Sequence, residues 1–329
     1  MKKVIISVVI IDLTFIILAI ILYGPWDYVR NIYVTTSMQT MNHKWLAKIF
    51  FNDKEIKKIM KKNYIVPINE NVNTNEIKFD NSVIYKSSYE KQVLMKKHKN
   101  DLYKLITTKV GNAKGYIVII YDPTKISLIR TKKFVADDKG ERVIDLCKRY
   151  KGTVCINGGG FENGLMDNSS IPQGYVIDNG KIVWQSNNKG NIIGFTQDGK
   201  LKLMSNVSGE EAIAAGIRQG IEFGPFLIIN GQTSKIEGTP YGIANKCAIA
   251  QRKDGIVLFL VTEGKTYANG ATLKDVIKTL KKYGARNAAN LDGGQSASLV
   301  INNKLINTPN YLAKKNGGRN VVTGWGVIP

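Results

Sequence analysis

Two segments of the chain place amide and carboxylate side chains directly before runs of glycine. In the first, Asn157 precedes three glycines at 158–160, and in the second, Asn290 and Asp292 precede two glycines at 293–294. Glycine has no Cβ, so backbone N–H groups can approach an anion closely there. Amides can hold sugar hydroxyls, and a carboxylate at the end of a strand can act in acid–base chemistry. Both segments are therefore candidates for a polar ligand site, and neither has the spacing of a nucleotide-binding glycine loop.

Short apolar and β-branched runs, separated by Asn-Gly and Asp-Gly turns, predict the strands that position these side chains. The predicted strands cover 116–121, 127–131, 153–156, 175–177, 182–185, 192–195, 223–229, 248–251 and 256–262. Helices are predicted at 141–150, 209–215 and 272–283, the last with a capping box formed by Thr272 and Asp275. This pattern is typical of an α+β, or mixed α/β, domain in which strands dominate.

An apolar run over 4–23 follows Lys2 and Lys3 at the N-terminus. Twenty helical residues span roughly 30 Å, the thickness of the hydrocarbon layer. Asp12 opposes insertion by roughly 2.5–3.5 kcal/mol, but the Val, Ile, Leu and Phe residues of the run outweigh it. The two lysines predict a cytoplasmic N-terminus, with everything after Tyr23 outside. We interpret the run as an uncleaved single-pass anchor in the cell membrane. A cleaved signal peptide is the alternative, but no Ala-x-Ala site follows.

Residues 26–75 are interpreted as a juxtamembrane segment. A basic helix is predicted over 42–63, because apolar residues recur there at helical spacing with lysines between them. Its lysines fit either a surface against anionic lipid headgroups or the solvated face of a packed helix. A polar, Asn-rich stretch at 69–75 predicts a linker. The predicted organisation is an anchor at 1–25, this segment, and one strand-dominated domain at 76–329.

Lysine and arginine (47) outnumber aspartate and glutamate (26), which gives the chain a formal charge of +21. Such an excess attracts polyanions, including phosphate-bearing polymers and anionic lipids. The alternative explanation is a composition rich in Lys, Asn and Ile throughout, since the lysines are scattered. No nucleic-acid motif accompanies the charge, so a nucleic-acid partner is not predicted.

The three cysteines, Cys147, Cys155 and Cys247, are odd in number and match no zinc pattern. Free cysteine is among the most buried residue types. We therefore predict that all three are small core residues and that the domain does not depend on a disulfide framework.

The two glycine segments, in this order and separation, resemble the phosphodiester glycosidase family, which includes N-acetylglucosamine-1-phosphodiester α-N-acetylglucosaminidase and bacterial exopolysaccharide biosynthesis proteins. The resemblance covers about residues 110–329. It rests on Gly140-Glu141-Arg142-Val143, Ile156-Asn157-Gly158-Gly159, Gly224-Pro225-Phe226-Leu227-Ile228, Ala248-Ile249, Asp254-Gly255, Glu263-Gly264-Lys265, Thr272-Leu273, Asn290-Leu291-Asp292-Gly293-Gly294 with Ser296, and Arg319. The Asn-Leu-Asp-Gly-Gly segment with its following serine is the most specific single motif.

The resemblance implies hydrolysis at the anomeric carbon of a sugar that is linked through phosphate. Such a site needs a carboxylate near the anomeric carbon, cations on the phosphate and amides on the sugar. The implied catalytic carboxylates are Asp292 and Glu263. The implied substrate-binding residues are Asn157, Gly158, Gly159, Lys246, Lys265, Asn290, Gly293, Gly294, Ser296 and Arg319. The implied partner is a sugar-phosphate or anionic polysaccharide, such as a surface or wall polymer that carries N-acetylglucosamine-1-phosphodiester groups.

Several positions depart from the family pattern, among them Cys247 and Ala250, which stand where threonine and glycine are usual. Gln295 stands where a third glycine is usual, Lys246 and Lys265 stand where arginine is usual, and Glu263 replaces aspartate. Lysine keeps the positive charge but loses bidentate phosphate binding. These departures leave a second function open, that of a non-catalytic protein that binds sugar-phosphate polymers at the cell surface.

The sequence requires no cofactor. Asp292, Glu162 and Glu263 offer oxygen ligands of the kind that Ca²⁺ takes, although no spacing demands a metal. The oligomeric state is not predicted.

Overall fold

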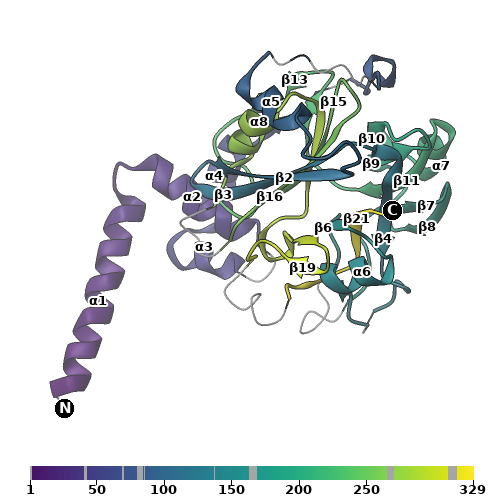
Figure 1. The fold of residues 1–329 in the computed structure, drawn as a ribbon. Helices are drawn as coiled ribbons and strands as arrows, with labels where there is room; N and C mark the ends of the chain where they lie inside the picture. The colour runs from purple at the N-terminus through teal and green to yellow at the C-terminus, as the bar shows by residue number, and fades with distance from the viewer. Residues whose placement is uncertain are drawn as a thin grey trace. The chain divides into compact units, whose positions relative to one another are not determined.

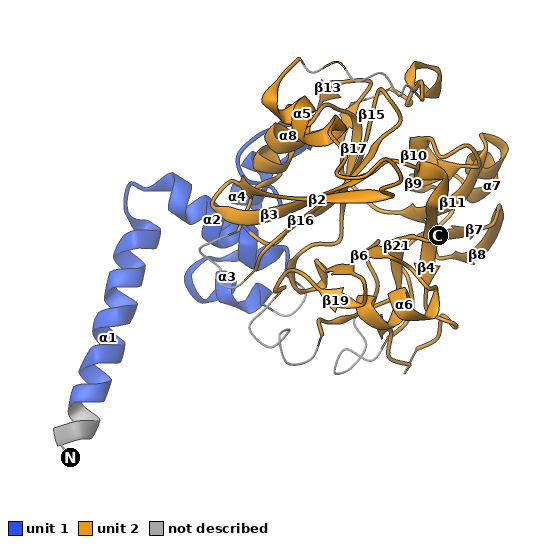
Figure 2. Ribbon diagram, viewed as in Figure 1, with its two compact units in different colours: residues 1–65, 236–243 blue, residues 66–235, 244–329 orange. Residues whose placement is uncertain are grey.

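The structure is a computed structural model that describes residues 2–40, 43–68, 70–79, 84, 86–136, 138–162, 169–264, 270–309 and 317–329, with only the backbone of residues 2–5. The chain forms two compact units (Figure 2). Unit 1 comprises residues 1–65 and 236–243, and unit 2 comprises residues 66–235 and 244–329. The chain therefore first passes from unit 1 to unit 2 after residue 65, which is earlier in the sequence than the boundary predicted at 75.

The described part of unit 1 is helical, and its longest helix is α1, the purple helix that runs to the N-terminus in Figure 1. Its helices are α1 (Lys2–Tyr23), α2 (Asp27–Met38), α3 (Lys44–Phe50) and α4 (Asp53–Lys62). Within α1, the stretch Ile6–Tyr23 is long and apolar enough to cross a membrane, and almost all of it is exposed. The apolar run predicted over 4–23 therefore forms a helix as expected.

The single helix predicted over 42–63 is wrong, because α3 and α4 divide that segment. The break occurs where Asn52 caps α4: Asn52 Oδ1 accepts a hydrogen bond from Glu55 N (2.9 Å), and Glu55 Oε2 accepts one from Asn52 N (3.0 Å). A reciprocal cap of this kind starts a new helix. Ile56 and Ile59 of α4 then enter the unit 1 core with Leu22. The lysines of α4 are all exposed: Lys54, Lys57, Lys58, Lys61 and Lys62.

Strands dominate unit 2, as predicted, and those of its sheets pair antiparallel (Figure 1). The strands of its largest sheet are β2 (Tyr103–Val110), β3 (Ala113–Ile120), β12 (Phe226–Ile229), β13 (Gln232–Thr233), β15 (Cys247–Arg252), β16 (Val257–Thr262) and β17 (Ala285–Leu291). Their spatial order is β13-β12-β17-β15-β16-β3-β2.

Two five-stranded sheets complete the body of unit 2. One contains β4 (Ile126–Arg130), β6 (Val154–Asn157), β18 (Leu299–Ile301), β19 (Lys304–Leu305) and β21 (Thr323–Val327), in the order β19-β18-β6-β21-β4. The other contains β7 (Tyr175–Asp178), β8 (Lys181–Gln185), β9 (Gly190–Thr196), β10 (Leu201–Val207) and β11 (Ile217–Glu222), in the order β10-β9-β11-β7-β8. The remaining strands form short pairs: β5 (Glu141–Arg142) with β20 (Asn320–Val321), and β1 (Ile65–Val66) with β14 (Lys235–Ile236).

All three sheets contribute to one apolar core of unit 2. Phe259 comes from the largest sheet, Trp325 from the second and Phe195 from the third, and the Trp325 and Phe195 rings meet edge-on with centroids 5.4 Å apart. Helices line the unit: α5 (Ser88–Leu94), α6 (Val143–Arg149), α7 (Gly209–Ala214) and α8 (Leu273–Lys282). The predicted capping box of Thr272 and Asp275 is confirmed at the start of α8.

Cys147 and Cys155 form a disulfide, which corrects the prediction that the domain lacks one. Both residues are buried as predicted, Cys147 in α6 and Cys155 in β6. The bond joins α6 to β6 two residues before Asn157. Cys247 is a buried free thiol, as predicted.

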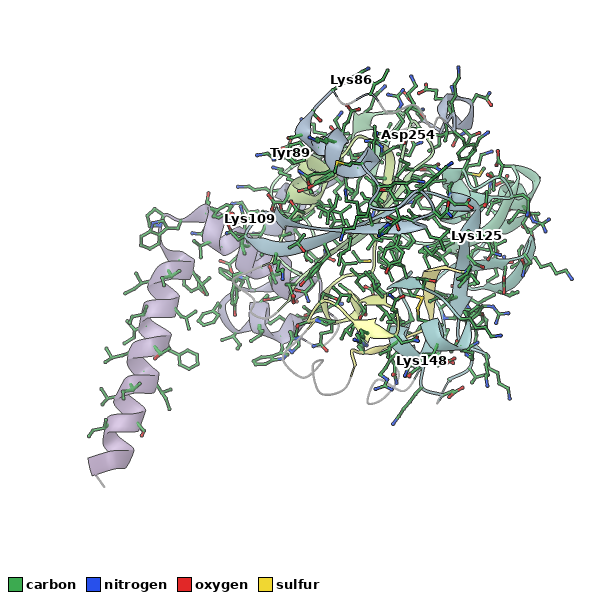
Figure 3. All side chains as sticks on the ribbon, viewed as in Figure 1. Lys86, Tyr89, Lys109, Lys125, Lys148 and Asp254 are labelled. Carbon is green, nitrogen blue, oxygen red and sulfur yellow. A yellow bond between two sulfur atoms is a disulfide. The ribbon has the colours of Figure 1, made fainter. Side chains whose placement is uncertain are left out.

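The positive charge of unit 2 is spread around its surface. Lys86, Lys109, Lys125 and Lys148 project from different edges of the unit in Figure 3. This distribution fits the scattered lysines of the sequence better than one concentrated basic patch.

Candidate functional site

The two glycine segments meet where strands of two sheets end. β6 ends at Asn157, and β17 ends at Leu291, which pairs with Cys247 at the start of β15. The backbone N–H of Asp292 donates to the Gly158 carbonyl (3.0 Å). The chain positions named by the two motifs are therefore neighbours in unit 2, although 135 residues separate Asn157 from Asp292.

Asn157 fastens the second segment to the first. Its Nδ2 donates to the Asp292 carbonyl (2.7 Å), and its Oδ1 accepts from the Ser298 backbone N–H (3.0 Å). The side chain is fully buried. These bonds give Asn157 a positioning role, and its contact with a substrate stays a prediction.

The glycines of the first segment allow its backbone to lie close to neighbouring backbone segments. Gly158 N donates to the Thr323 carbonyl (2.8 Å), and Gly159 N donates to Thr323 Oγ1 (3.1 Å). A Cβ at Gly159 would lie 2.9 Å from the Glu222 carbonyl oxygen, which no side chain tolerates without a shift. Both N–H groups are thus used inside the protein, and the expected binding of a ligand by Gly158 and Gly159 stays a prediction.

The glycines of the second segment form the turn that follows Asp292. Gly294 has φ +58°, a left-handed conformation that glycine adopts without strain. Its N–H donates to the Asn245 carbonyl (3.0 Å), and Asn245 Nδ2 donates back to the Gly294 carbonyl (2.9 Å). A Cβ at Gly293 would lie 2.7 Å from the same Asn245 oxygen. Asn245 therefore holds the turn that presents the Asp292 carboxylate.

The carboxyl group of Asp292 is the most chemically poised group of the second segment. Burial raises the pKa of Asp292 from 3.8 to about 6. A hydrogen bond with the Ser296 side chain, the positive charge of Arg319 and the Gly293 backbone N–H act in the opposite direction. The residue is nevertheless only partly covered. A carboxylate that titrates near neutral pH at an accessible strand end is typical of a catalytic position.

Arg319 links the first segment to Asp292. Its guanidinium lies over the Phe161 ring, 4.8 Å from the ring centroid, and its charge acts on the Asp292 carboxylate. Stacking of this kind fixes the plane of the guanidinium group. Arg319, Ser296 and Asp292 are thus brought together, and their action on a substrate stays a prediction.

Asn290 presents an amide oxygen at the same strand end. Asn290 Nδ2 donates to the Gly224 carbonyl (3.3 Å), while the backbone N–H donates to the Pro225 carbonyl (3.0 Å). Within the part of the chain that the structure describes, the buried Asn290 Oδ1 accepts no hydrogen bond. A buried acceptor that receives no hydrogen bond costs free energy. This oxygen is therefore suited to accept a hydrogen bond from a ligand hydroxyl.

Lys246 is also buried. It directly precedes β15, and its backbone N–H donates to Thr262 Oγ1 (2.8 Å). Burial lowers the pKa of Lys246 from 10.5 to about 7, with the charge of Asp275 acting in the opposite direction. A lysine that is partly neutral at pH 7 is a weaker phosphate ligand than the arginine that is usual here.

Glu263 is held by two hydrogen bonds inside the protein. Tyr116 Oη donates to Glu263 Oε1 (2.7 Å), and Thr308 N donates to Glu263 Oε2 (2.7 Å). The residue is buried, and its negative charge, together with burial, raises the pKa of Tyr116. This geometry gives Glu263 a structural task, and its role as the second catalytic carboxylate stays a prediction.

Lys265 lies outside the described residues. Among the residues that the structure does describe, no group of three or more His, Cys, Asp and Glu side chains could hold a metal ion. Glu162 is exposed, and the Glu263 oxygens already accept hydrogen bonds. A Ca²⁺ ion held by Asp292, Glu162 and Glu263 stays a prediction that these contacts do not favour.

The sequence did not predict three residues of the site region. Besides Asn245, Asn307 donates to the Ala297 carbonyl (2.7 Å) and accepts from Leu299 N (2.8 Å), which fixes the strand after the turn. Glu222 places its carbonyl against Gly159, and burial raises the pKa of its carboxyl group. Asparagines in loops give no sequence signal, but Glu222 stands two residues before the Gly-Pro pair of a recognised motif.

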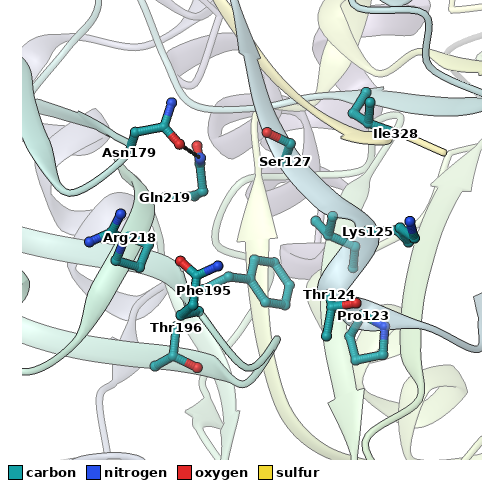
Figure 4. A pocket seen from close by; sticks show the side chains of 12 residues that line it. Pro123, Thr124, Lys125, Ser127, Asn179, Phe195, Thr196, Arg218, Gln219 and Ile328 are labelled. Carbon is teal, nitrogen blue, oxygen red and sulfur yellow. Dashed lines mark hydrogen bonds between the residues drawn. The ribbon is translucent and has the colours of Figure 1, made fainter.

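A surface pocket of about 180 Å³ lies elsewhere on unit 2 (Figure 4). Lys125 and Arg218 line it, together with Ile328 at the far end of β21 from Thr323. Five residues of strand span about 16 Å, so this pocket opens at the opposite end of the strand from the glycine segments. It contains none of the motif residues, and we do not assign the site to it.

Comparison with protein families identifies one match. The family model described as phosphodiester glycosidase matches residues 150–328. The SPbeta prophage-derived uncharacterized protein YomE of Bacillus subtilis is 27% identical over 213 residues, which is 61% of this chain and 33% of YomE. The chain thus spans about a third of the length of that relative.

One solved structure shows the same fold. The zebrafish N-acetylglucosamine-1-phosphodiester α-N-acetylglucosaminidase catalytic domain, auto-inhibited by its pro-peptide, is similar with a TM-score of 0.58 and 23% identity over 71% of this chain and 86% of that domain. A hypothetical protein from Synechocystis is similar with a TM-score of 0.47 and 16% identity, over 68% of this chain and 61% of its own. Because the family model covers more than half of the sequence, the chain belongs to the phosphodiester glycosidase family.

Proposed function

We propose that this chain hydrolyses the glycosidic bond of sugar-1-phosphodiesters, such as N-acetylglucosamine-1-phosphodiester groups on a cell-surface polysaccharide or wall polymer. Membership of the family supports a hydrolase of this kind. The zebrafish relative is named for an N-acetylglucosamine-1-phosphodiester substrate, which supports the choice of sugar. The observation that carries the proposal is the partly accessible Asp292 carboxylate, titrating near pH 6 beside Arg319 and Ser296.

In the proposed reaction the bond between the anomeric carbon and the phosphate oxygen breaks, and the oxygen of water ends on that carbon. The phosphate leaves as a monoester, so the demand for a general acid is small. Ionised Asp292 stabilises or attacks the anomeric carbon, which carries positive charge in the transition state. Arg319 binds the departing phosphate, and Asn290 Oδ1 accepts a hydroxyl hydrogen bond from the sugar.

We place this reaction outside the cytoplasm, on a domain that α1 anchors in the cell membrane. The exposed apolar stretch Ile6–Tyr23 supports the anchor. The disulfide between Cys147 and Cys155 supports an oxidising compartment, because such bonds are rare in the cytosol. With the N-terminus inside, unit 2 faces the polymers of the cell surface.

A binding protein without catalysis is the second candidate, and two observations favour it. Both Glu263 oxygens accept hydrogen bonds within the protein, which leaves Asp292 as the carboxylate best placed for chemistry among the predicted pair. Most glycosidases use two carboxyl groups. The lowered pKa of Lys246 also weakens the cationic clamp on the phosphate.

Product analysis separates the two functions. The full chain in detergent micelles is incubated with a panel of N-acetylglucosamine- and glucose-1-phosphodiesters, and the released sugar and phosphomonoester are both measured. Hydrolysis should release them in equal amounts. Asp292→Asn serves as the matched variant that keeps the shape of the site. Release of sugar by the wild type and not by the variant supports hydrolysis. Saturable binding of the same diesters without release by the wild type would instead establish the binding protein.

A further inference from the structure

Helix α3 in unit 1 carries an exposed apolar stripe. Trp45 is 56% exposed and Ile49 is 48% exposed, and a spacing of four residues puts them on one helix face. Lys44 and Lys48 directly precede them and are also exposed. The stripe is therefore bordered by positive charge, while Ala47 on another face is fully buried in unit 1.

The same helix is attached to the apolar stretch of α1. The Phe50 ring at the end of α3 lies 6.3 Å from the Phe15 ring of α1, between centroids, and the Phe51 ring lies 5.4 Å from that of Tyr23. Tyr33 Oη of α2 donates to the Leu46 carbonyl (2.7 Å), which holds α3 in place.

Phe15 fixes the depth at which α3 lies along α1. It stands eight residues before Tyr23, which is about 12 Å along the helix axis. Ile6–Tyr23 is long enough to fill most of the hydrocarbon layer. In a membrane that α1 spans, the end of α3 is therefore beside the outer half of the bilayer, where water cannot cover Trp45 and Ile49.

The charge around the stripe matches an anionic lipid surface. Residues 26–65 contain eight Lys and Arg residues against three Asp and Glu residues. Lysines beside apolar residues at a membrane boundary extend their ammonium groups to the headgroup phosphates, and tryptophan is enriched at the same level. Both residue types occur on α3, where Trp45 directly follows Lys44.

We propose that α3 is a membrane-interface element, with Trp45 and Ile49 inserted in the outer leaflet beside α1 and with Lys44 and Lys48 on anionic headgroups. The proposal rests on the anchor function proposed for α1. It gives unit 1 a second attachment to the same membrane, independent of any catalytic activity of unit 2.

Spin labels on single introduced cysteines test the depth of the stripe. The native cysteines provide a silent background, because Cys147 and Cys155 are bonded and Cys247 is buried. Trp45→Cys and Ile49→Cys are labelled in the full chain, in nanodiscs that contain phosphatidylglycerol. Ile10→Cys marks the interior of the anchor, and Lys181→Cys marks an exposed position on β8. Collision rates with oxygen and with a water-soluble nickel chelate are then compared.

We expect labels at 45 and 49 to collide more often with oxygen than with the nickel chelate, at a depth shallower than that of the label at 10. The label at 181 should show the reverse ratio. If 45 and 49 behave like 181 while 10 is in lipid, the interface proposal is wrong and the anchor stands. If the label at 10 is also in water, the anchor is wrong and the interface proposal fails with it. Dipolar broadening between labels at 45 would assign the stripe to a second copy of the chain and overturn the lipid contact.

Discussion

Asp292→Asn removes one negative charge from the candidate site while keeping the shape of the side chain. Burial raises the pKa of Asp292 from 3.8 to about 6. A shift of about two pKa units corresponds to about 3 kcal/mol, since each unit is worth about 1.4 kcal/mol. That free energy is the cost, in the folded protein, of keeping the carboxylate ionised.

The sign of the effect on stability follows from this shift. The folded protein binds the Asp292 proton more tightly than the unfolded chain does, so the group favours folding below pH 4, and that contribution is lost as the pH rises through 6. Asparagine has no such dependence, and its oxygen can still accept hydrogen bonds. We therefore expect the variant to gain up to about 3 kcal/mol relative to the wild type between pH 4 and pH 8.

The expected effect on activity has the opposite direction. If ionised Asp292 acts at the anomeric carbon, kcat/KM of the wild type rises with pH and levels off above an apparent pKa of about 6. Asp292→Asn should then reduce turnover by at least about 10² at pH 7.5. A carboxylate that destabilises the fold when charged, but is required for turnover, is retained for function. A purely structural carboxylate would instead be selected because it stabilises the fold.

The assay combines urea unfolding at pH 4, 6 and 8 with rate measurements on the same preparations in detergent micelles. Trp325 is fully buried in the core of unit 2 and reports its unfolding by fluorescence. Asp138→Asn, at an exposed position, controls for the loss of one charge. A stability difference that is the same at pH 4 and pH 8 would refute the desolvation of Asp292. Hydrolysis by Asp292→Asn at the wild-type rate would refute its catalytic assignment.

Two further predictions concern the frame of the site. Replacing Cys147 and Cys155 together by serine should cost about 2.5 kcal/mol in the unfolding free energy of unit 2, from the loop entropy of an eight-residue separation; urea unfolding with and without reductant measures it, and equal midpoints for the wild type under both conditions would show that the bond does not form. Glu263→Gln should destabilise the protein by about 1–3 kcal/mol, because one amide oxygen cannot replace two carboxylate acceptors for Tyr116 and Thr308. Its kcat should stay within about threefold of the wild type if Glu263 is structural, whereas a loss of about 10² or more would restore it as a catalytic carboxylate.

The sequence singled out two segments that the structure brings together. The strand predicted at 153–156 corresponds to β6, and the structure joins the end of β6 to the end of β17 through the Asp292 N–H and the Gly158 carbonyl. Alternating strands and the Thr272 cap of α8 are local features, so they follow from short-range chemistry. The motif order added the family, which the family model confirms.

What escaped prediction depends on contacts between distant residues. The structural task of Glu263 requires Tyr116, 147 positions away, and Thr308, 45 positions away. Three cysteines permit several pairings, and only the packing of α6 against β6 selects Cys147 with Cys155. The break between α3 and α4 is a different case: Asn52 and Glu55 form a capping box whose signature was present in the sequence, but helical spacing over 42–63 concealed it.

Hydrogen bonding inside the protein distinguishes the residues that support the site from those that could contact a ligand. Asn157 and Glu263 are buried with both polar ends engaged inside the protein, as expected of groups selected for stability. Asp292 and Lys246 instead have pKa values shifted by burial against their charged forms, and among the described residues nothing donates to Asn290 Oδ1. These costs fall on adjacent strand ends rather than at random. Polar groups with such costs cluster at functional sites, which is in line with the ligand role proposed for the second glycine segment.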